Sequence, residues 1–155
     1  MENEIILEFP KKSDHTVTRI KFLITHIDLS LLDKNFDIDV FCQKLYKYAT
    51  IVIAKDGEKD IGFFAIYTND HKTKTAHVPY FGILREYQNH IVAKKLSEYV
   101  DQCAIEEKMN QTVAEAHINN KAAIYNILRS GYVYFGQSAR KDYNKYIKYY
   151  TTEMD

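Results

Sequence analysis

The feature that most limits the fold is a pair of β-rich runs on either side of a tight turn signal. The runs Thr50 to Lys55 (TIVIAK) and Ile61 to Tyr67 (IGFFAIY) are rich in β-branched and aromatic residues, which strands favour. Between them, Asp56-Gly57 is a dipeptide typical of hairpin turns. The two runs are therefore expected to pair as an antiparallel hairpin.

Further strands are expected on the C-terminal side of this hairpin. Thr75 to Ile83 reads as a third strand, and its Pro79 lacks a backbone donor, which favours a bulge, an edge or a break in pairing. Thr112 to His117 reads as a fourth. After Gly131, the segments YVYFG and KYIKYYTTE are both strand candidates.

Helical periodicity separates these strands. Apolar residues at spacings of three and four predict helices from Ser13 to Ile27, Asp37 to Ala49, Asn89 to Met109, and Asn120 to Gly131. The first is ambiguous, because Ile20, Phe22 and Ile24 also alternate as in a strand. The order predicts a single mixed α/β sheet with helices on its faces.

Length and charge narrow the class of protein. A chain of 155 residues is expected to form one domain, residues 1–155. Lysine plus arginine equals aspartate plus glutamate, 21 each, so neither nucleic acid nor a membrane is an expected partner. The N-terminus is acidic and no apolar run reaches the roughly 18 residues of a membrane span, which predicts a cytoplasmic protein. Cys42 and Cys103 form no CxxC pair, so neither a disulfide nor a metal site is expected.

Two local motifs stand inside this element order. The first is Gln88-Asn89-His90-Ile91-Val92-Ala93, which follows the third strand and opens the long helix. The second runs from Asn120 to Tyr132, NKAAIYNILRSGY. In this order the chain resembles the GNAT acyltransferase superfamily, with motifs Q/RxxGxG/A and NxxAIxxYxxxGF. Ile91 replaces the central glycine of the first motif, and Ile127 occupies the tyrosine position of the second.

The resemblance implies a fold, an acyl donor and a set of donor-binding residues. It implies a mostly antiparallel sheet that splays between the strands at 75–83 and 112–117, where the pantetheine arm of acetyl-CoA adds its amides to an exposed strand edge. The donor-binding residues implied are Phe81, Ile83, Gln88, Asn89, His90, Ile91, Val92, Ala93, Lys94 and Asn120.

The missing glycine changes the shape of the phosphate-binding turn rather than its donors. A helix N-terminus binds pyrophosphate through unpaired backbone N–H groups and the positive end of the helix dipole, and Ile91 keeps its N–H. A β-branched residue does not tolerate positive φ. The turn is therefore expected either to stay right-handed with Ile91 pointing inward or to lose the cofactor.

The resemblance also implies an amine acceptor and a general base. His77 and Glu115 are the best base candidates, because Glu115 matches a glutamate common in the corresponding strand of the family and histidines titrate near neutral pH. His117 and Asp70 are weaker candidates. Tyr134 is offered as a general acid, since Tyr125 lies about 200° around the helix from Ile127.

Three functions are compatible with these residues. The leading hypothesis is an acetyl-CoA-dependent N-acetyltransferase of a small amine, such as an amino sugar or amino-acid derivative, and a homodimer is possible. The alternative is a catalytically inactive GNAT-fold binding or regulatory module, suggested by Ile91 and Ile127. A third reading takes the Lys/Tyr-rich segment from Arg140 to Tyr150 as a platform for single-stranded nucleic acid.

Overall fold

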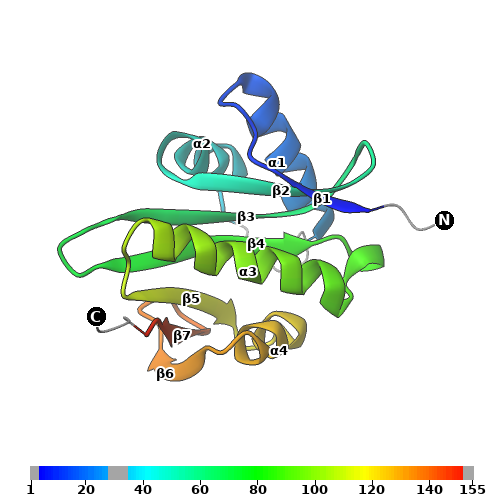
Figure 1. Ribbon diagram of the computed structural model, residues 1–155. Coiled ribbons are helices and arrows are strands. Elements are labelled where there is room, and N and C mark those ends of the chain that lie inside the picture. The colour runs from blue at the N-terminus through cyan, green and yellow to red at the C-terminus, as the bar shows by residue number, and fades with distance from the viewer. Residues whose placement is uncertain (1–3, 28–34, 152–155) are drawn as a thin grey trace. The chain divides into compact units, whose positions relative to one another are not determined.

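The computed structural model describes residues 4–27 and 35–151, and the side chains of Asp14 and His90 lie outside this description. Seven strands and four α-helices are present in the described part of the chain (Figure 1). The strands are β1 (Ile5–Glu8), β2 (Thr50–Asp56), β3 (Lys59–Asp70), β4 (Thr75–Ile83), β5 (Gln111–His117), β6 (Val133–Gln137) and β7 (Tyr143–Tyr149). The helices are α1 (Asp14–Ile27), α2 (Ile38–Tyr48), α3 (His90–Glu106) and α4 (Lys121–Arg129), and a 3-10 turn, η2 (Arg85–Tyr87), precedes α3.

The sheet has the order β1-β2-β3-β4-β5-β7-β6. β1 pairs antiparallel with β2, and β7 pairs antiparallel with both β5 and β6. β4 runs parallel to β5, with Thr75 to Val78 paired to Gln111 to Ala114. The expected mixed, mostly antiparallel sheet flanked by helices is therefore confirmed.

The predicted hairpin of β2 and β3 and the predicted helix α1 are both confirmed. Gly57 has φ +61° at the turn between β2 and β3, a conformation that glycine adopts without strain. In α1, Ile20 and Ile24 are fully buried while Phe22 is 51% exposed, so the period of a helix, not of a strand, places the apolar side chains inward.

One strand was not predicted. β1 is only four residues long, too short to show a clear alternation, and it is added to the sheet by pairing Ile5 to Glu8 with Ile53 to Asp56 of β2. The last strand was predicted two residues too late, since β7 begins at Tyr143. The end of the predicted segment, residues 152–153, lies outside the described residues.

The fold divides into two compact units, Met1–Ala65 with Tyr80–Leu96, and Ile66–Pro79 with Ser97–Asp155. In the first unit, α1 and α2 contact each other and α2 contacts β2. Fully buried apolar side chains come from each of these helices and from β2 and β3: Ile20, Leu23, Ile24, Leu45, Val52, Ile53, Phe63 and Phe64.

An ion cluster in the first unit joins α1 to β1 and β3. Arg19 donates from Nε and Nη2 to the two carboxylate oxygens of Asp60, both at 2.8 Å, and from Nη2 to Glu8 Oε1 at 2.6 Å. A bidentate pair of this kind is geometrically specific. The hydrogen bond from Arg19 lowers the pKa of Glu8 below its ordinary value. The stabilisation that Arg19 gives Glu8 is therefore fully present at pH values above the ordinary pKa of a glutamate, and it is lost as the pH falls through the lowered pKa of Glu8.

β3 and β4 approach each other closely at two glycines. A Cβ atom on Gly62 would lie 2.6 Å from the Gly82 carbonyl oxygen and 3.1 Å from Ile83 Cα. A Cβ on Gly82 would instead meet the Tyr80 ring, with the hydroxyl oxygen at 2.5 Å. Only the first contact involves main chain, which a side-chain rotation cannot relieve.

We expect Gly62→Ala to destabilise the protein by about 1–3 kcal/mol, because the added methyl forces a backbone shift. Gly82→Ala is the matched control and should cost less, since the Tyr80 side chain can move. Denaturant unfolding of both variants measures the difference. Equal stability of Gly62→Ala and the unsubstituted protein would contradict this account.

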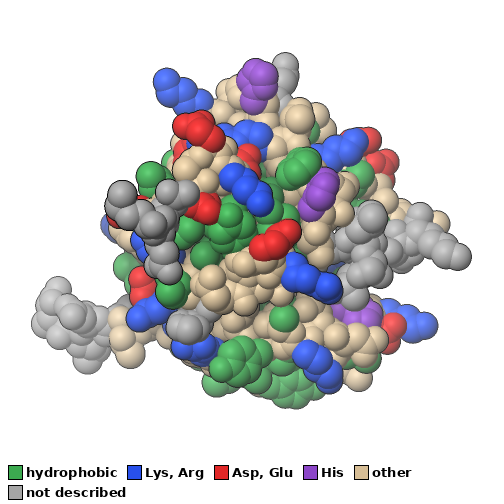
Figure 2. Space-filling view, turned by 90° about the vertical axis from the view of Figure 1, so that its right-hand side faces the viewer, with side chains coloured by type: hydrophobic (Ala, Val, Ile, Leu, Met, Phe, Trp, Pro, Cys, Tyr) green, Lys and Arg blue, Asp and Glu red, His purple; other side chains and the backbone are tan. Residues whose placement is uncertain are grey.

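The second unit has its own small core where α4 covers β5. Ala114, Ala116, Tyr132 and Tyr146 are buried together, and Ala123, Ile124 and Ile127 of α4 pack on them. The opposite side of α4 is exposed, with Tyr125 at 64% and Leu128 at 48%. Hydrophobic side chains gather along the lower edge of the face in Figure 2, at the level at which α4 lies in Figure 1.

A polar network in the same unit connects α3 to β5 and β7. Asp101 accepts from Lys148 Nζ at 2.6 Å and from the Tyr150 hydroxyl at 2.9 Å. Lys148 Nζ also donates to the Ser130 carbonyl at 2.7 Å, and the Tyr150 hydroxyl lies 2.6 Å from Thr112 Oγ1. Burial raises the pKa of Tyr150 well above its usual value, so this hydroxyl remains a donor to Asp101.

Candidate functional site

The predicted phosphate turn is free of backbone strain. Among the described residues, positive φ at non-glycine positions occurs only at Lys74, Lys108 and Asp142. Ile91 therefore has the right-handed conformation that the sequence allowed. Its side chain is 57% exposed, so it points to solvent rather than inward. The absence of glycine is compatible with this turn because no residue of it needs a left-handed backbone.

The N-terminus of α3 is capped by Asn89. Its side-chain Oδ1 accepts from the backbone N–H of Ile91 at 3.0 Å and of Val92 at 3.2 Å, and its carbonyl accepts from Ala93 N at 3.4 Å. Asparagine is a preferred N-cap residue for this reason. The N–H groups of Ile91 and Val92, two of those expected to hold phosphate, are thus already satisfied by the protein, and an anion that binds them has to displace the Asn89 carboxamide.

The other predicted residues of this turn have different surroundings. Val92 and Ala93 are buried at 1% and 6% exposure, which leaves only their backbone for a ligand. Gln88 Nε2 donates to the Ile83 carbonyl at 3.0 Å, and Lys94 is exposed. The side chain of His90 lies outside the described residues.

The end of β4 supplies the predicted backbone partners Phe81 and Ile83. Phe81 is half-buried and stacks on Phe64, with ring centroids 6.5 Å apart. Ile83 is buried at 5% exposure, and its carbonyl is the acceptor for Gln88. That hydrogen bond joins the strand end directly to the first residue of the turn.

A second anchor holds the segment before the turn. The Tyr87 hydroxyl in η2 donates to Asp56 Oδ2 at 2.7 Å, at the end of β2. Lys59 Nζ lies 5.3 Å from the centroid of the Tyr87 ring. The other Asp56 oxygen, Oδ1, is buried without a hydrogen-bond partner, so the carboxylate depends on Tyr87.

Tyr87→Phe is expected to lower the midpoint of thermal unfolding. The variant removes the donor that Asp56 depends on, and a half-buried carboxylate without a donor is unfavourable. Differential scanning fluorimetry measures the change in midpoint. Tyr87→Phe with Asp56→Asn is the companion variant, because an amide is less costly to leave unpaired than a charge. If the double variant had an unfolding midpoint no higher than that of Tyr87→Phe, the dependence of the Asp56 carboxylate on Tyr87 would be contradicted.

In the second unit, the strand register decides which catalytic candidates share a face. His77 is paired with Val113 in β5, and Glu115 lies two residues further along the same strand. Side chains two residues apart point to the same side of a sheet, so His77 and Glu115 share a face. Both side chains are exposed.

Tyr134 lies on the other face. It is paired with Tyr146, which is itself paired with Ala114, and Ala114 precedes Glu115 by one residue. The Tyr134 ring meets the Tyr146 ring edge-on at a centroid distance of 5.9 Å. The register therefore separates Tyr134 from Glu115, and the structure gives the predicted general acid no contact with the candidate bases.

Glu115 is held by a loop residue that the sequence did not single out. The Ser138 hydroxyl donates to Glu115 Oε2, and Ser138 Oγ accepts from the Arg140 backbone N–H at 3.0 Å. The Arg140 guanidinium carbon lies 3.8 Å from the centroid of the Tyr143 ring. His117 meets the same ring edge-on at 5.3 Å. These side chains form one continuous cluster, which we call the Glu115 cluster.

The remaining candidates have structural roles. Asn120 caps α4, with Oδ1 accepting from Ala123 N at 3.1 Å. Asp70 accepts from Thr73 N at 3.1 Å and from Thr73 Oγ1 at 2.6 Å, and these bonds lower the pKa of Asp70. His117 Nδ1 accepts from Asn119 N at 3.1 Å. Each side chain completes a turn or a helix start.

The two cysteines are protonated thiols at neutral pH. Burial raises the pKa of Cys42 and of Cys103 to about 11. A thiolate, not a thiol, is the nucleophile and metal ligand. Within residues 4–27 and 35–151, no group of three or more His, Cys, Asp or Glu side chains is arranged to hold a metal ion.

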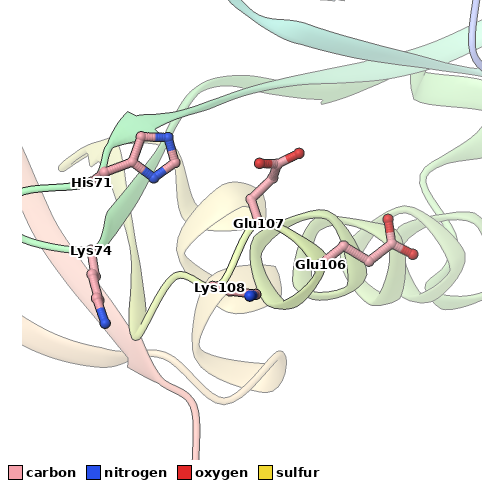
Figure 3. Close-up of a pocket in the computed structure, with 5 residues that line it drawn as sticks. All are labelled: His71, Lys74, Glu106, Glu107 and Lys108. Atoms are coloured by element: carbon pink, nitrogen blue, oxygen red, sulfur yellow. The ribbon is translucent and has the colours of Figure 1, made fainter.

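A pocket elsewhere in the second unit is lined by charged and titratable side chains of mixed sign (Figure 3). His71 and Lys74 come from the turn between β3 and β4, and Glu106, Glu107 and Lys108 come from the end of α3 and the residues after it. All five are exposed. None of the predicted site residues lines this pocket.

Comparison with known proteins assigns the family. Residues 23–132 match the acetyltransferase (GNAT) family, which is most of the chain. The chain therefore belongs to the GNAT acetyltransferase family. No curated protein sequence matches it.

Several solved structures share the fold. PH1933 from Pyrococcus horikoshii OT3 has a TM-score of 0.80 at 16% identity and covers 96% of this chain and 100% of its own. An acetyltransferase from Streptococcus agalactiae has a TM-score of 0.80 at 16% sequence identity, and the match covers 94% of this chain and 98% of that one. The PaiA N-acetyltransferase from Thermoplasma acidophilum, in complex with coenzyme A, has a TM-score of 0.76 at 10% sequence identity, and the match covers 95% of this chain and 99% of that one.

The described helices show no membrane-spanning candidate, since none is both long and apolar enough to cross a bilayer.

Proposed function

We propose that this protein is an acetyl-CoA-dependent N-acetyltransferase that acts on the primary amine of a small molecule, such as an amino sugar or amino-acid derivative. The observation that supports it best is the Glu115 carboxylate, which is exposed on a sheet face and oriented by the Ser138 hydroxyl. An amine is protonated at neutral pH and needs a base before it can attack a carbonyl. A GNAT-family chain that presents an oriented carboxylate on its sheet has the group this step requires.

The α3 N-terminus is proposed to bind the donor's pyrophosphate. The backbone N–H groups of Ile91 and Val92 would donate to phosphate oxygens after the Asn89 carboxamide moves away, and Lys94 would add positive charge. The helix dipole favours an anion at this end. When bound, acetyl-CoA supplies the thioester carbonyl that the amine attacks.

Glu115 is proposed to take the proton that the amine loses as its nitrogen bonds to the acetyl carbon. The carbon–sulfur bond then breaks and the electron pair leaves with sulfur. A thiol with a pKa near 8.5 leaves tolerably as the thiolate, so the chemistry does not depend on a tyrosine at the position of Ile127. This agrees with Ile127 packing into the core beneath α4.

The Asn89 cap favours a second candidate, an inactive GNAT-fold binding or regulatory module. A cap that satisfies both N–H groups stabilises the empty turn and competes with a phosphate. In that case neither acetyl-CoA binding nor turnover would be detected.

CoA release from acetyl-CoA, detected with a thiol reagent over a broad panel of primary amines, separates the two candidates. The acetyltransferase proposal expects amine-dependent release above the buffer rate. No release with any amine at saturating acetyl-CoA would contradict it and support the binding module.

A further inference from the structure

Arg140 of the Glu115 cluster and the neighbouring Lys145 both rest on aromatic rings. Arg140 lies over Tyr143 at 3.8 Å from the ring centroid, and Lys145 Nζ lies 5.4 Å from the centroid of Phe135. A guanidinium stacked on a ring keeps its N–H edge available for a planar anion. Both cations are therefore held by ring contacts, and within the described part of the chain their side-chain donors make no hydrogen bond.

Neither cation has a carboxylate partner among residues 4–27 and 35–151. The salt bridges between described residues include neither Arg140 nor Lys145. Lys145 lies directly opposite Glu115 in the β5–β7 register, where an ion pair would be expected. Glu115 instead accepts from the Ser138 hydroxyl. The positive charges beside the candidate base are thus uncompensated within the described part of the chain.

The geometry places these groups within the reach of one small molecule. Tyr143 and Lys145 are two residues apart on β7 and point to the same side, at a spacing of roughly 7 Å. Their cross-strand partners in β5 are His117 and Glu115, so the candidate base lies directly across from Lys145, and Tyr143, whose ring carries Arg140, lies two residues before Lys145 on β7. An acceptor whose amine meets Glu115 would bring its neighbouring substituents against Arg140 and Lys145.

We propose that the acceptor is an amine with an anionic oxygen group, a carboxylate or a phosphate, close to its amino group, and that Arg140 and Lys145 bind that group. The inference rests on the proposed acetyl transfer and narrows its acceptor class. Tyr143 and Phe135 act as the platforms that fix the two cations. A neutral or polycationic amine would leave both cations unpaired or repel them.

Matched acceptors test this inference. The pairs are an amino acid with its carboxamide and an amino sugar with its phosphate ester, each assayed for kcat/KM by CoA release. The anionic member of at least one pair should be preferred by about ten-fold or more, as expected for a charge-assisted contact. The pair that shows the preference identifies the anion.

Arg140→Gln and Lys145→Gln should each remove the preference, because KM should rise much more for the anionic member of a pair than for the neutral member. Lys121→Gln, which removes an exposed charge at the start of α4, is the control for net charge and should keep the preference. Release that favours neutral or cationic amines would overturn the inference and leave the acetyl transfer standing. No release with any amine would overturn both.

Discussion

Replacing Glu115 by glutamine is expected to lower kcat by about 10²–10⁴-fold, the range in which a positioned base contributes, with little change in acetyl-CoA affinity. Glutamine keeps the size of the side chain and can still accept from the Ser138 hydroxyl, but it cannot take a proton from the amine. Steady-state kinetics with an active amine measure kcat, and circular dichroism checks the fold.

His77→Gln is the matched comparison for this prediction. His77 shares the sheet face with Glu115, but the Glu115 carboxylate is the one held by a donor. The larger loss should therefore come from Glu115→Gln. A large loss in His77→Gln with an active Glu115→Gln would contradict the assignment and make the histidine the base.

Ser138 is expected to act as a positioning residue through Glu115. Ser138→Ala removes the donor to Oε2 and should lower kcat by roughly ten-fold at an unchanged KM, because a displaced base loses the benefit of orientation. Ser138→Thr keeps a hydroxyl and should restore most of the rate. If the threonine variant were no better than alanine, the hydroxyl would have only a structural role in the loop.

Asp101→Ala is expected to destabilise the protein by about 2–3 kcal/mol. It removes the acceptor for the Lys148 ammonium and for the half-buried Tyr150 hydroxyl. The side chains of Asp101 and Lys148 are each 23% exposed, so solvent reduces the penalty below that of a fully buried pair. Denaturant unfolding measures the loss.

The double variant Asp101→Ala with Lys148→Met is the control. It replaces the charge that Asp101→Ala leaves unpaired with an apolar chain of similar length, and it should recover part of the lost stability. Equal loss in the single and double variants would contradict the view that the unpaired Lys148 ammonium causes the destabilisation.

Much of the fold was predictable because it depends on local periodicity. The β2–β3 hairpin follows from two β-branched runs around Asp56-Gly57, and α3 follows from apolar residues at spacings of three and four. β1 could not be predicted in this way, because four residues show no period and the strand exists only through its pairing with β2. Sequence periodicity therefore identifies the long helices and strands, whereas a short strand such as β1 is defined only by the strand it pairs with.

The candidate site was less predictable because it depends on register. His77 and Glu115 were both named as base candidates, and the register then placed them on one face. Tyr134 lies on the other face, and predicting this requires the β6–β7 register, which shifts between Tyr134 and Gly136. The contact of Ser138 with Glu115 joins a loop to a strand across 23 residues of sequence, and no sequence spacing indicates it.

The sequence does indicate an N-cap at Asn89, but the resemblance of its motif to the GNAT family assigned this residue to phosphate binding. Asparagine directly before a helix start is a preferred N-cap, and here the same residue fell inside the phosphate motif. The two readings compete for the same N–H groups. In the folded protein Asn89 forms the cap, which its place in the sequence does not decide.

Calorimetric titration with acetyl-CoA of the unsubstituted protein and of Asn89→Ala tests the central claim, that main-chain N–H groups at the start of α3 hold the donor's phosphates without glycine. Both proteins should bind, and Asn89→Ala should bind at least as tightly despite losing about 1 kcal/mol of stability with its cap, because no carboxamide has to be displaced. Absence of binding by both proteins at millimolar acetyl-CoA, or loss of binding in Asn89→Ala alone, would contradict it.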